Sequence, residues 1–130
     1  MSKGKILVVD DEADVRELMT VVLETAGYEV NELDCGKGVI DFVAAAPPDL
    51  IVLDVTMPVM DGMAVLELLR IDPTARTIPV LMASAQNQES TMRRARDLGA
   101  NDFLVKPWVD GELEWRVAEC LAQAEGRQAA

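Results

Sequence analysis

The chain has 130 residues, half of them hydrophobic and 27% charged, which is the composition of one globular domain and excludes a disordered segment. Its net charge of −11 argues against direct contact with nucleic acid, because an acidic surface repels the phosphate backbone. The lack of histidine excludes a Ser-His triad, and two lone cysteines suit a reducing compartment better than a zinc site or a disulfide scaffold. No apolar stretch approaches the roughly 20 residues of a membrane span, so we expect a cytoplasmic protein without membrane contact.

Short apolar runs alternate with segments of helical periodicity in the first part of the chain. The run at 5–9 predicts a buried strand, and the apolar stripe after it predicts a helix over 14–26, which a glycine ends. Residues 28–33 alternate between apolar and polar side chains, as in a short edge strand. A second helix is predicted over 39–44, and two prolines follow it.

The rest of the chain continues the alternation with three strands and three helices. The strands are expected at 50–53, 79–83 and 103–105, and the helices at 62–71, at 92–98 and from Asp110, a predicted N-cap. Apolar runs of this length are typical of strands covered on both faces of a parallel sheet. Five strands and five helices therefore predict one doubly wound α/β domain over 1–124, with 125–130 as a short polar tail or the start of a linker.

Four of the predicted strands end on polar residues that form one chemical set. The first runs into Asp10 and Asp11, and the others into Asp54, Ser84 and Lys106. In an open α/β sheet the ligand site lies beyond the carboxyl ends of the strands, so we expect these side chains to meet at one edge. Carboxylates, a hydroxyl and an ammonium together make a site for a divalent cation and a phosphoryl group.

The predicted chemistry is phosphoryl transfer to the carboxylate of Asp54, which would give a labile acyl phosphate. Asp10 and Asp11 supply hard oxygen ligands of the kind that Mg²⁺ prefers. Lys106 offers a mobile positive charge for one phosphoryl oxygen, and Ser84 could donate a hydrogen bond to another. Such catalysis depends on positioning and electrostatics, so it needs no histidine base.

Each of these residues also has a simpler interpretation. Asp10 and Asp11 could belong to a solvated acidic loop near a helix N-terminus, and Asp54 could cap the following turn. Ser84 could be a surface hydroxyl, and Lys106 with the proline after it could form a turn. These separate interpretations do not predict that four strands place suitable groups at the same end.

The matching motifs resemble those of the receiver domain of two-component response regulators. They are the segment 6–12, Asp54 with Met57-Pro58 and Asp61-Gly62, Ser84-Ala85 and Lys106-Pro107, in that order and at similar separations. The resemblance extends over about 5–122, which is nearly the whole chain. Each motif alone has low specificity, but together they are highly specific.

The resemblance implies a (βα)5 flavodoxin-like fold with a five-stranded parallel sheet of order 2-1-3-4-5. It makes Asp54 the phosphoacceptor. It also implies that Mg²⁺ is bound by Asp11 directly, by Asp10 largely through water, by the Asp54 carboxylate and by the backbone carbonyl of Thr56. The bond between Lys106 and Pro107 is expected to be cis.

The same resemblance implies a signalling module rather than a turnover enzyme. A sensor histidine kinase or a histidine phosphotransfer protein would supply the phosphoryl group from a phosphohistidine. Ser84 would then move toward the phosphoryl group and Phe103 would turn inward, which switches the face formed by the fourth helix, the last strand and the fifth helix. Phe103 could equally be an ordinary core ring. Thr56 and Gln86 would flank the path of attacking water, and Trp108 would lie near the site.

Three alternatives stay open. One is a pseudo-receiver, an interaction module that is never phosphorylated. Another is an aspartate-nucleophile phosphatase of the haloacid dehalogenase type, although that class needs a second Asp where this chain has Thr56. The third concerns Arg93, Arg94 and Arg96, which could dock an acidic partner or a second copy, or could form a solvated helix face that pairs with Glu89 and Asp97.

Overall fold

Five parallel strands form one sheet in the order β2-β1-β3-β4-β5 in the computed structural model, which describes residues 2–129. The strands are β1 (Lys5–Val9), β2 (Glu29–Leu33), β3 (Leu50–Asp54), β4 (Val80–Ser84) and β5 (Asp102–Val105). The helices are α1 (Ala13–Thr25), α2 (Val39–Ala45), α3 (Gly62–Ile71), α4 (Glu89–Asp97) and α5 (Glu112–Ala129), with a short 3₁₀ turn, η1 (Gly36–Gly38), before α2. The predicted (βα)5 flavodoxin-like fold and its strand order are confirmed.

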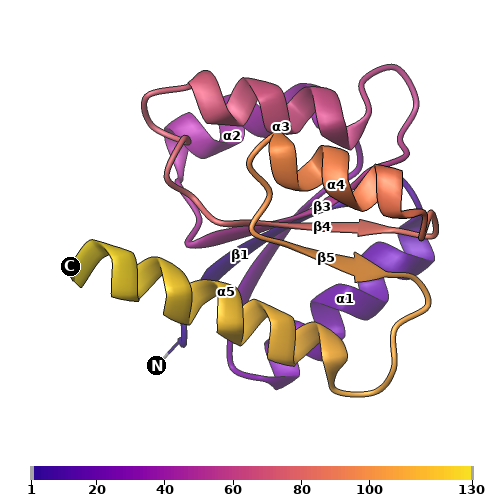
Figure 1. Ribbon diagram of the computed structural model, residues 1–130. Helices are drawn as coiled ribbons and strands as arrows, with labels where there is room; N and C mark the ends of the chain where they lie inside the picture. Colours follow the sequence, from indigo (N-terminus) through magenta and orange to yellow (C-terminus); the bar gives the residue numbers. More distant parts are fainter. Residues whose placement is uncertain (1, 130) are drawn as a thin grey trace.

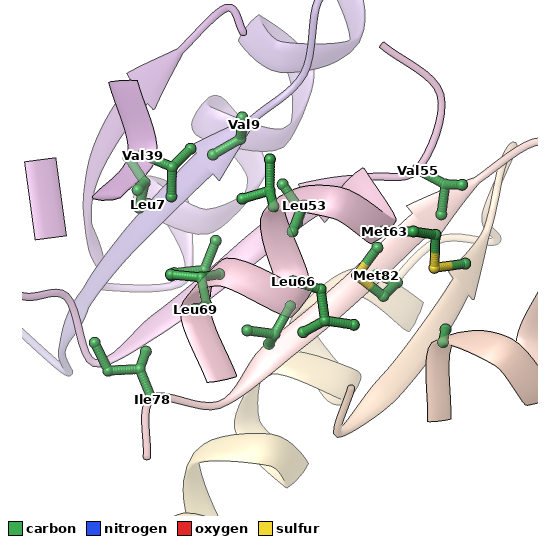
Figure 2. Packing of buried hydrophobic residues seen from close by; sticks show 14 of the residues in the cluster. Leu7, Val9, Val39, Leu53, Val55, Met63, Leu66, Leu69, Ile78 and Met82 are labelled. Carbon is green, nitrogen blue, oxygen red and sulfur yellow. The ribbon is translucent and has the colours of Figure 1, made fainter. Parts of the chain in front are cut away.

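The helices cover both faces of the sheet, so two separate cores form (Figure 1). One core lies under α2, α3 and α4, and the other lies under α1 and α5. Alternate side chains of each buried strand enter opposite cores: Leu7 and Val9 of β1 pack on the first side, and Ile6 and Val8 on the second. Figure 2 shows the first core, in which Leu66 and Leu69 of α3 pack over the sheet. This two-sided burial explains why the strands appear in the sequence as unbroken apolar runs.

The strand register brings the strand ends together at one edge. Val9 of β1 pairs with Leu53 of β3, and Leu53 pairs with Met82 of β4. The next residues along the chain, Asp10 and Asp54, therefore lie side by side at the carboxyl ends of β1 and β3. The register fixes the predicted site at the carboxyl edge of β1, β3, β4 and β5.

The C-terminal helix differs from the expectation in two respects. It begins at Glu112, two residues after Asp110, because a turn at 110–111 precedes it and the φ of Gly111 is 88°. It also continues to Ala129, so residues 125–129 of the predicted polar tail or linker start are helical, and residue 130 lies outside the described residues. The division of the chain at residue 124 stays a prediction. None of the helices in the described part of the chain is long and apolar enough to cross a membrane.

Candidate functional site

The sheet brings all five predicted polar residues to the same edge. Asp10 follows β1, Asp54 ends β3 and Ser84 ends β4, and each of these side chains is almost completely buried. Lys106 directly follows β5. Oxygen atoms of Asp10, Asp11 and Asp54 all lie within 4.8 Å of one another, with Asp11 on the exposed side.

Lys106 is the positive charge within this carboxylate cluster. Its Nζ donates a hydrogen bond of 2.6 Å to Oδ2 of Asp10 and lies 3.3 Å from Oδ1 of Asp54. Burial by itself lowers the pKa of Lys106, but the hydrogen bond to Asp10 and the negative charges of Asp54 and Asp10 outweigh it, so the pKa lies above its usual value. Lys106 therefore stays charged at neutral pH. Its peptide bond to Pro107 is cis, as the resemblance implied.

Asp54 carries the strongest electrostatic perturbation at this edge. Burial raises the pKa of its carboxyl to about 7; Lys106 opposes the increase, whereas the charge of Asp10 and a hydrogen bond with Asp11 add to it. Three acidic groups thus share one ammonium, and the site has an excess of negative charge. A further cation at this position would favour the ionised form of Asp54.

The donor set fits a hard divalent cation. Carboxylate oxygens are the ligands that Mg²⁺ prefers, and the cluster formed by Asp10, Asp11 and Asp54 is the only group of three potential ligands this close within residues 2–129. Asp10 is oriented by its own loop, because its Oδ1 accepts a hydrogen bond of 2.9 Å from the backbone N–H of Glu12. The backbone carbonyl of Thr56 as a fourth ligand stays a prediction.

Ser84 and Phe103, the predicted switch pair, lie on the neighbouring strands β4 and β5. The hydroxyl oxygen of Ser84 accepts a hydrogen bond of 3.0 Å from the backbone N–H of Gln86, and the carbonyl of Ser84 accepts one of 2.9 Å from the N–H of Lys106. Phe103 is buried in the core beneath α3 and α4. Its burial is compatible with an inward switch position and with a permanent core ring.

The loop after β3 requires a glycine at one position and places a strained residue at another. A Cβ on Gly62 would lie 2.1 Å from the backbone carbonyl oxygen of Asp54, so the Asp61-Gly62 pair lets α3 begin directly against the end of β3. Asp61 caps this helix, since its Oδ1 accepts from the N–H of Ala64 at 3.0 Å. Val59 is fully exposed and has a φ of 70°, which is rare for a β-branched residue, and the sequence pattern did not indicate it.

Trp108 lies beside the site, as predicted. Together with Pro107 and Lys106 it lines a groove of about 430 Å³, whose opposite wall is formed by Val15, Leu18 and Val22 of α1. Leu18 is about half exposed. A change around Lys106 is therefore expected to alter the surroundings of the Trp108 indole, whereas Trp115 is exposed on α5.

The three arginines of α4 are all exposed. Arg93 pairs with Glu89 at 2.8 Å, which confirms that one member of the cluster has a local partner. Nearby, a cavity of about 170 Å³ between α4, β5 and α5 is lined by Arg96, Phe103 and Arg116 among others. Arg116 is itself held by Asp102 at 2.9 Å and by Glu112 at 2.8 Å.

Three polar side chains form a hydrogen-bonded chain that joins the loops after β3 and β4 to the first turn of α4. Gln86 Nε2 donates to Thr56 Oγ1 at 3.4 Å, and Thr91 Oγ1 donates to Gln86 Oε1 at 3.4 Å. The sequence indicated Thr56 and Gln86 but not Thr91. Thr91 belongs to the first turn of α4, and the sequence pattern did not predict that α4 extends this far toward the site.

Comparisons with known proteins identify similar sequences and similar structures. The family described as response regulator receiver domain matches residues 6–118. The chain is 35% identical to the phosphate regulon transcriptional regulatory protein PhoB of Pseudomonas aeruginosa over 89% of this chain and 51% of that protein. It is 37% identical to the alkaline phosphatase synthesis transcriptional regulatory protein PhoP of Bacillus subtilis, over 93% of this chain and 50% of that protein. The chain thus spans about half the length of these relatives.

Solved structures show the same similarity in three dimensions. A response regulator from Chloroflexus aurantiacus superimposes with a TM-score of 0.88 and 36% identity, covering 92% of this chain and 98% of that one. The chemotaxis protein CheY4 of Vibrio cholerae superimposes with a TM-score of 0.85 and 29% identity, covering 90% of this chain and 98% of that one.

Proposed function

The chain belongs to the response regulator receiver domain family, and on that premise we propose that Asp54 accepts a phosphoryl group from the phosphohistidine of a sensor histidine kinase or a histidine phosphotransfer protein. One observation carries the proposal. A buried aspartate at the end of β3 has two further carboxylates and the Lys106 ammonium within reach, and no other such carboxylate cluster occurs within residues 2–129.

The proposed transfer is a displacement at phosphorus. An Oδ atom of Asp54 forms the new O–P bond while the P–N bond to the donor imidazole breaks, and the imidazole leaves with the electron pair. The ionised carboxylate needs no base to remove a proton, which accords with the absence of histidine from the chain. Mg²⁺ bound by Asp10, Asp11 and Asp54 would offset the negative charge of the carboxylates and the phosphoryl oxygens.

Lys106 and Ser84 would respond to the phosphoryl group. The Nζ of Lys106 already lies 3.3 Å from Oδ1 of Asp54, so a modest side-chain movement would bring it to a phosphoryl oxygen. The Ser84 hydroxyl ends the neighbouring strand and could donate a hydrogen bond to another. Ser84 pairs with Val105 of β5, the strand that also holds Phe103. A movement of Ser84 toward the phosphoryl group would therefore be passed to the face formed by α4, β5 and α5.

That face is the proposed output surface. The exposed residues Arg93, Arg94 and Arg96 would meet an acidic partner or a second copy of the chain. The relatives PhoB and PhoP are transcriptional regulators about twice as long as this chain, so an output through a further domain is part of the proposal. The chain would act as a signalling module whose only chemistry is its own phosphorylation and dephosphorylation.

Intrinsic tryptophan fluorescence tests this function, with Trp115→Phe as the background so that Trp108 is the reporter. We expect a saturable response to Mg²⁺ and a second response to beryllofluoride, a phosphoryl mimic, and we expect Asp54→Asn to abolish the second. Asp41→Asn, which removes an exposed carboxylate on α2, is the matched control. A beryllofluoride response that persists in Asp54→Asn would contradict the assignment of Asp54 as the phosphoacceptor. Failure of beryllofluoride and acetyl phosphate to modify the wild type would favour the pseudo-receiver.

A further inference from the structure

Helix α4 is held firmly at one end and weakly at the other. Ala95 is its one buried residue, and of its other side chains only the half-buried Met92 packs against the hydrophobic core. After its C-terminal end, Arg70 donates hydrogen bonds to the carbonyl of Gly99 at 2.9 Å and to Oδ1 of Asn101 at 3.1 Å. At its N-terminal end, the side chain of Gln88 provides no cap, and residues 85–90 are exposed.

The N-terminal turn of α4 is instead connected to the phosphoacceptor site through side chains. Thr91 donates to the amide oxygen of Gln86, and the amide nitrogen of Gln86 donates to the hydroxyl of Thr56. Both ends of the Gln86 amide are therefore engaged. Thr56 lies two residues after Asp54, and Gln86 lies two residues after Ser84, so the amide bridges the loops that follow β3 and β4.

We propose that Thr91 is a positioning residue that sets the lifetime of the acyl phosphate on Asp54. The inference rests on the proposed function and adds a residue on α4 to it. In this proposal Thr91 holds the Gln86 amide between the two loops, where the amide hinders the approach of water to the phosphorus atom. Without this hydrogen bond the amide is free to move away, and hydrolysis becomes faster.

The step that Thr91 controls is the attack of water on the phosphoryl group. The water oxygen forms a bond to phosphorus, the bond between phosphorus and Oδ of Asp54 breaks, and the electron pair returns to the carboxylate. Both water protons remain on the inorganic phosphate that is released. Gln86 neither gives nor accepts a proton in this step, so its contribution is steric and its position is what matters.

One consequence is that the lifetime depends on the position of α4. The helix carries Arg93 and Arg94 on its exposed surface, two and three residues after Thr91. A partner that draws the N-terminal turn of α4 away from the sheet would break the bond between Thr91 and Gln86. Such a partner would shorten the signal without touching Asp54.

The experiment labels the protein with acetyl phosphate and Mg²⁺, removes the donor and follows the decay of the acyl phosphate by intact mass. Thr91→Val keeps the shape of the side chain and removes the hydroxyl. We expect its decay to be about three- to tenfold faster than that of the wild type, the effect of losing one hydrogen bond. Gln86→Ala should give a similar increase, and the double variant should be no faster than either one.

Two controls separate positioning from a general structural effect. Thr91→Ser retains the hydroxyl and should restore slow decay, and Ser90→Ala on the adjacent exposed position should decay as the wild type does. The rate of labelling by acetyl phosphate should be the same in Ser90→Ala as in the wild type. If the acyl phosphate of a folded Thr91→Val protein decays at the wild-type rate, the inference is overturned while the proposed function stands. A wild type that takes up no phosphoryl group would overturn the proposed function and the inference with it.

Discussion

Lys106 donates its shorter hydrogen bond to Asp10 rather than to Asp54: Nζ lies 2.6 Å from Oδ2 of Asp10 and 3.3 Å from Oδ1 of Asp54. The ammonium therefore balances the charge of Asp10 while it stays within reach of the phosphoacceptor. This arrangement leaves the carboxylate cluster with a deficit of positive charge. Several consequences of that deficit can be measured.

Removal of the ammonium should destabilise the protein. In Lys106→Met, Asp10 and Asp54 lose their buried counter-charge, and we expect the free energy of unfolding at pH 7 in chelator to fall by about 1–3 kcal/mol. Chemical denaturation measures the change, and added Mg²⁺ should recover part of it. Lys37→Met, at an exposed position, is the control. Equal stability of the two variants would show that Lys106 does not balance these carboxylates.

The raised pKa of Asp54 makes stability depend on pH. Its carboxyl has a pKa of about 7 in the folded chain and 3.8 when unfolded, so between these values the folded state binds more protons. The extra proton therefore stabilises the folded state. This stabilisation is fully present below about pH 4 and is lost as the pH rises through 7. Since each pKa unit is worth about 1.4 kcal/mol, the loss should be roughly 2–4 kcal/mol.

Asp54→Asn isolates this contribution. In chelator, the difference in unfolding free energy between this variant and the wild type should grow in favour of the variant from pH 5 to pH 8. Asp41→Asn should show no such trend. A difference between Asp54→Asn and the wild type that stays constant over this range would refute the assignment of the raised pKa to Asp54.

Asp11 should contribute to cation binding and little to folding, because it is the exposed member of the cluster. We expect Asp11→Ala to weaken Mg²⁺ binding by about tenfold or more while the free energy of unfolding in chelator stays close to that of the wild type. Isothermal titration with Mg²⁺ gives the affinity. Asp14→Ala, on the exposed first turn of α1, should bind as the wild type does. An unchanged Mg²⁺ affinity in Asp11→Ala would show that the cation binds elsewhere.

The backbone of Val59 carries strain that glycine would relieve. A β-branched residue at a φ of 70° is disfavoured by about 1–2 kcal/mol, and glycine loses part of that gain to the entropy of the unfolded chain. Val59→Gly should therefore raise the free energy of unfolding by about 0.5–1 kcal/mol. Thermal unfolding measures this, and a lower Tm would contradict it. Since the Val59 side chain is fully exposed, labelling by acetyl phosphate should not change.

The sequence predicted the fold and the polar residues at the sheet edge because both depend on strand ends, which the apolar runs define. Asp54 and Ser84 could be placed this way since each ends such a run. The link from Thr91 to Gln86 depends on where a helix with few apolar side chains begins and on two side-chain conformations, and neither leaves a pattern in the sequence. The left-handed backbone at Val59 likewise has no signal, because valine does not favour it. Residues 125–129 looked like a tail from their small and polar composition, yet they continue a long helix.

The central claim is that Asp54 is the phosphoacceptor of a Mg²⁺-dependent receiver. Intact-mass analysis after incubation with acetyl phosphate, with Mg²⁺ and with chelator, tests it most directly. We expect the wild type and Asp41→Asn to gain one phosphoryl group with Mg²⁺ and none with chelator, and Asp54→Asn to gain none in either condition. A stable phosphoryl group on Asp54→Asn, or none on the wild type in the presence of Mg²⁺, would contradict it.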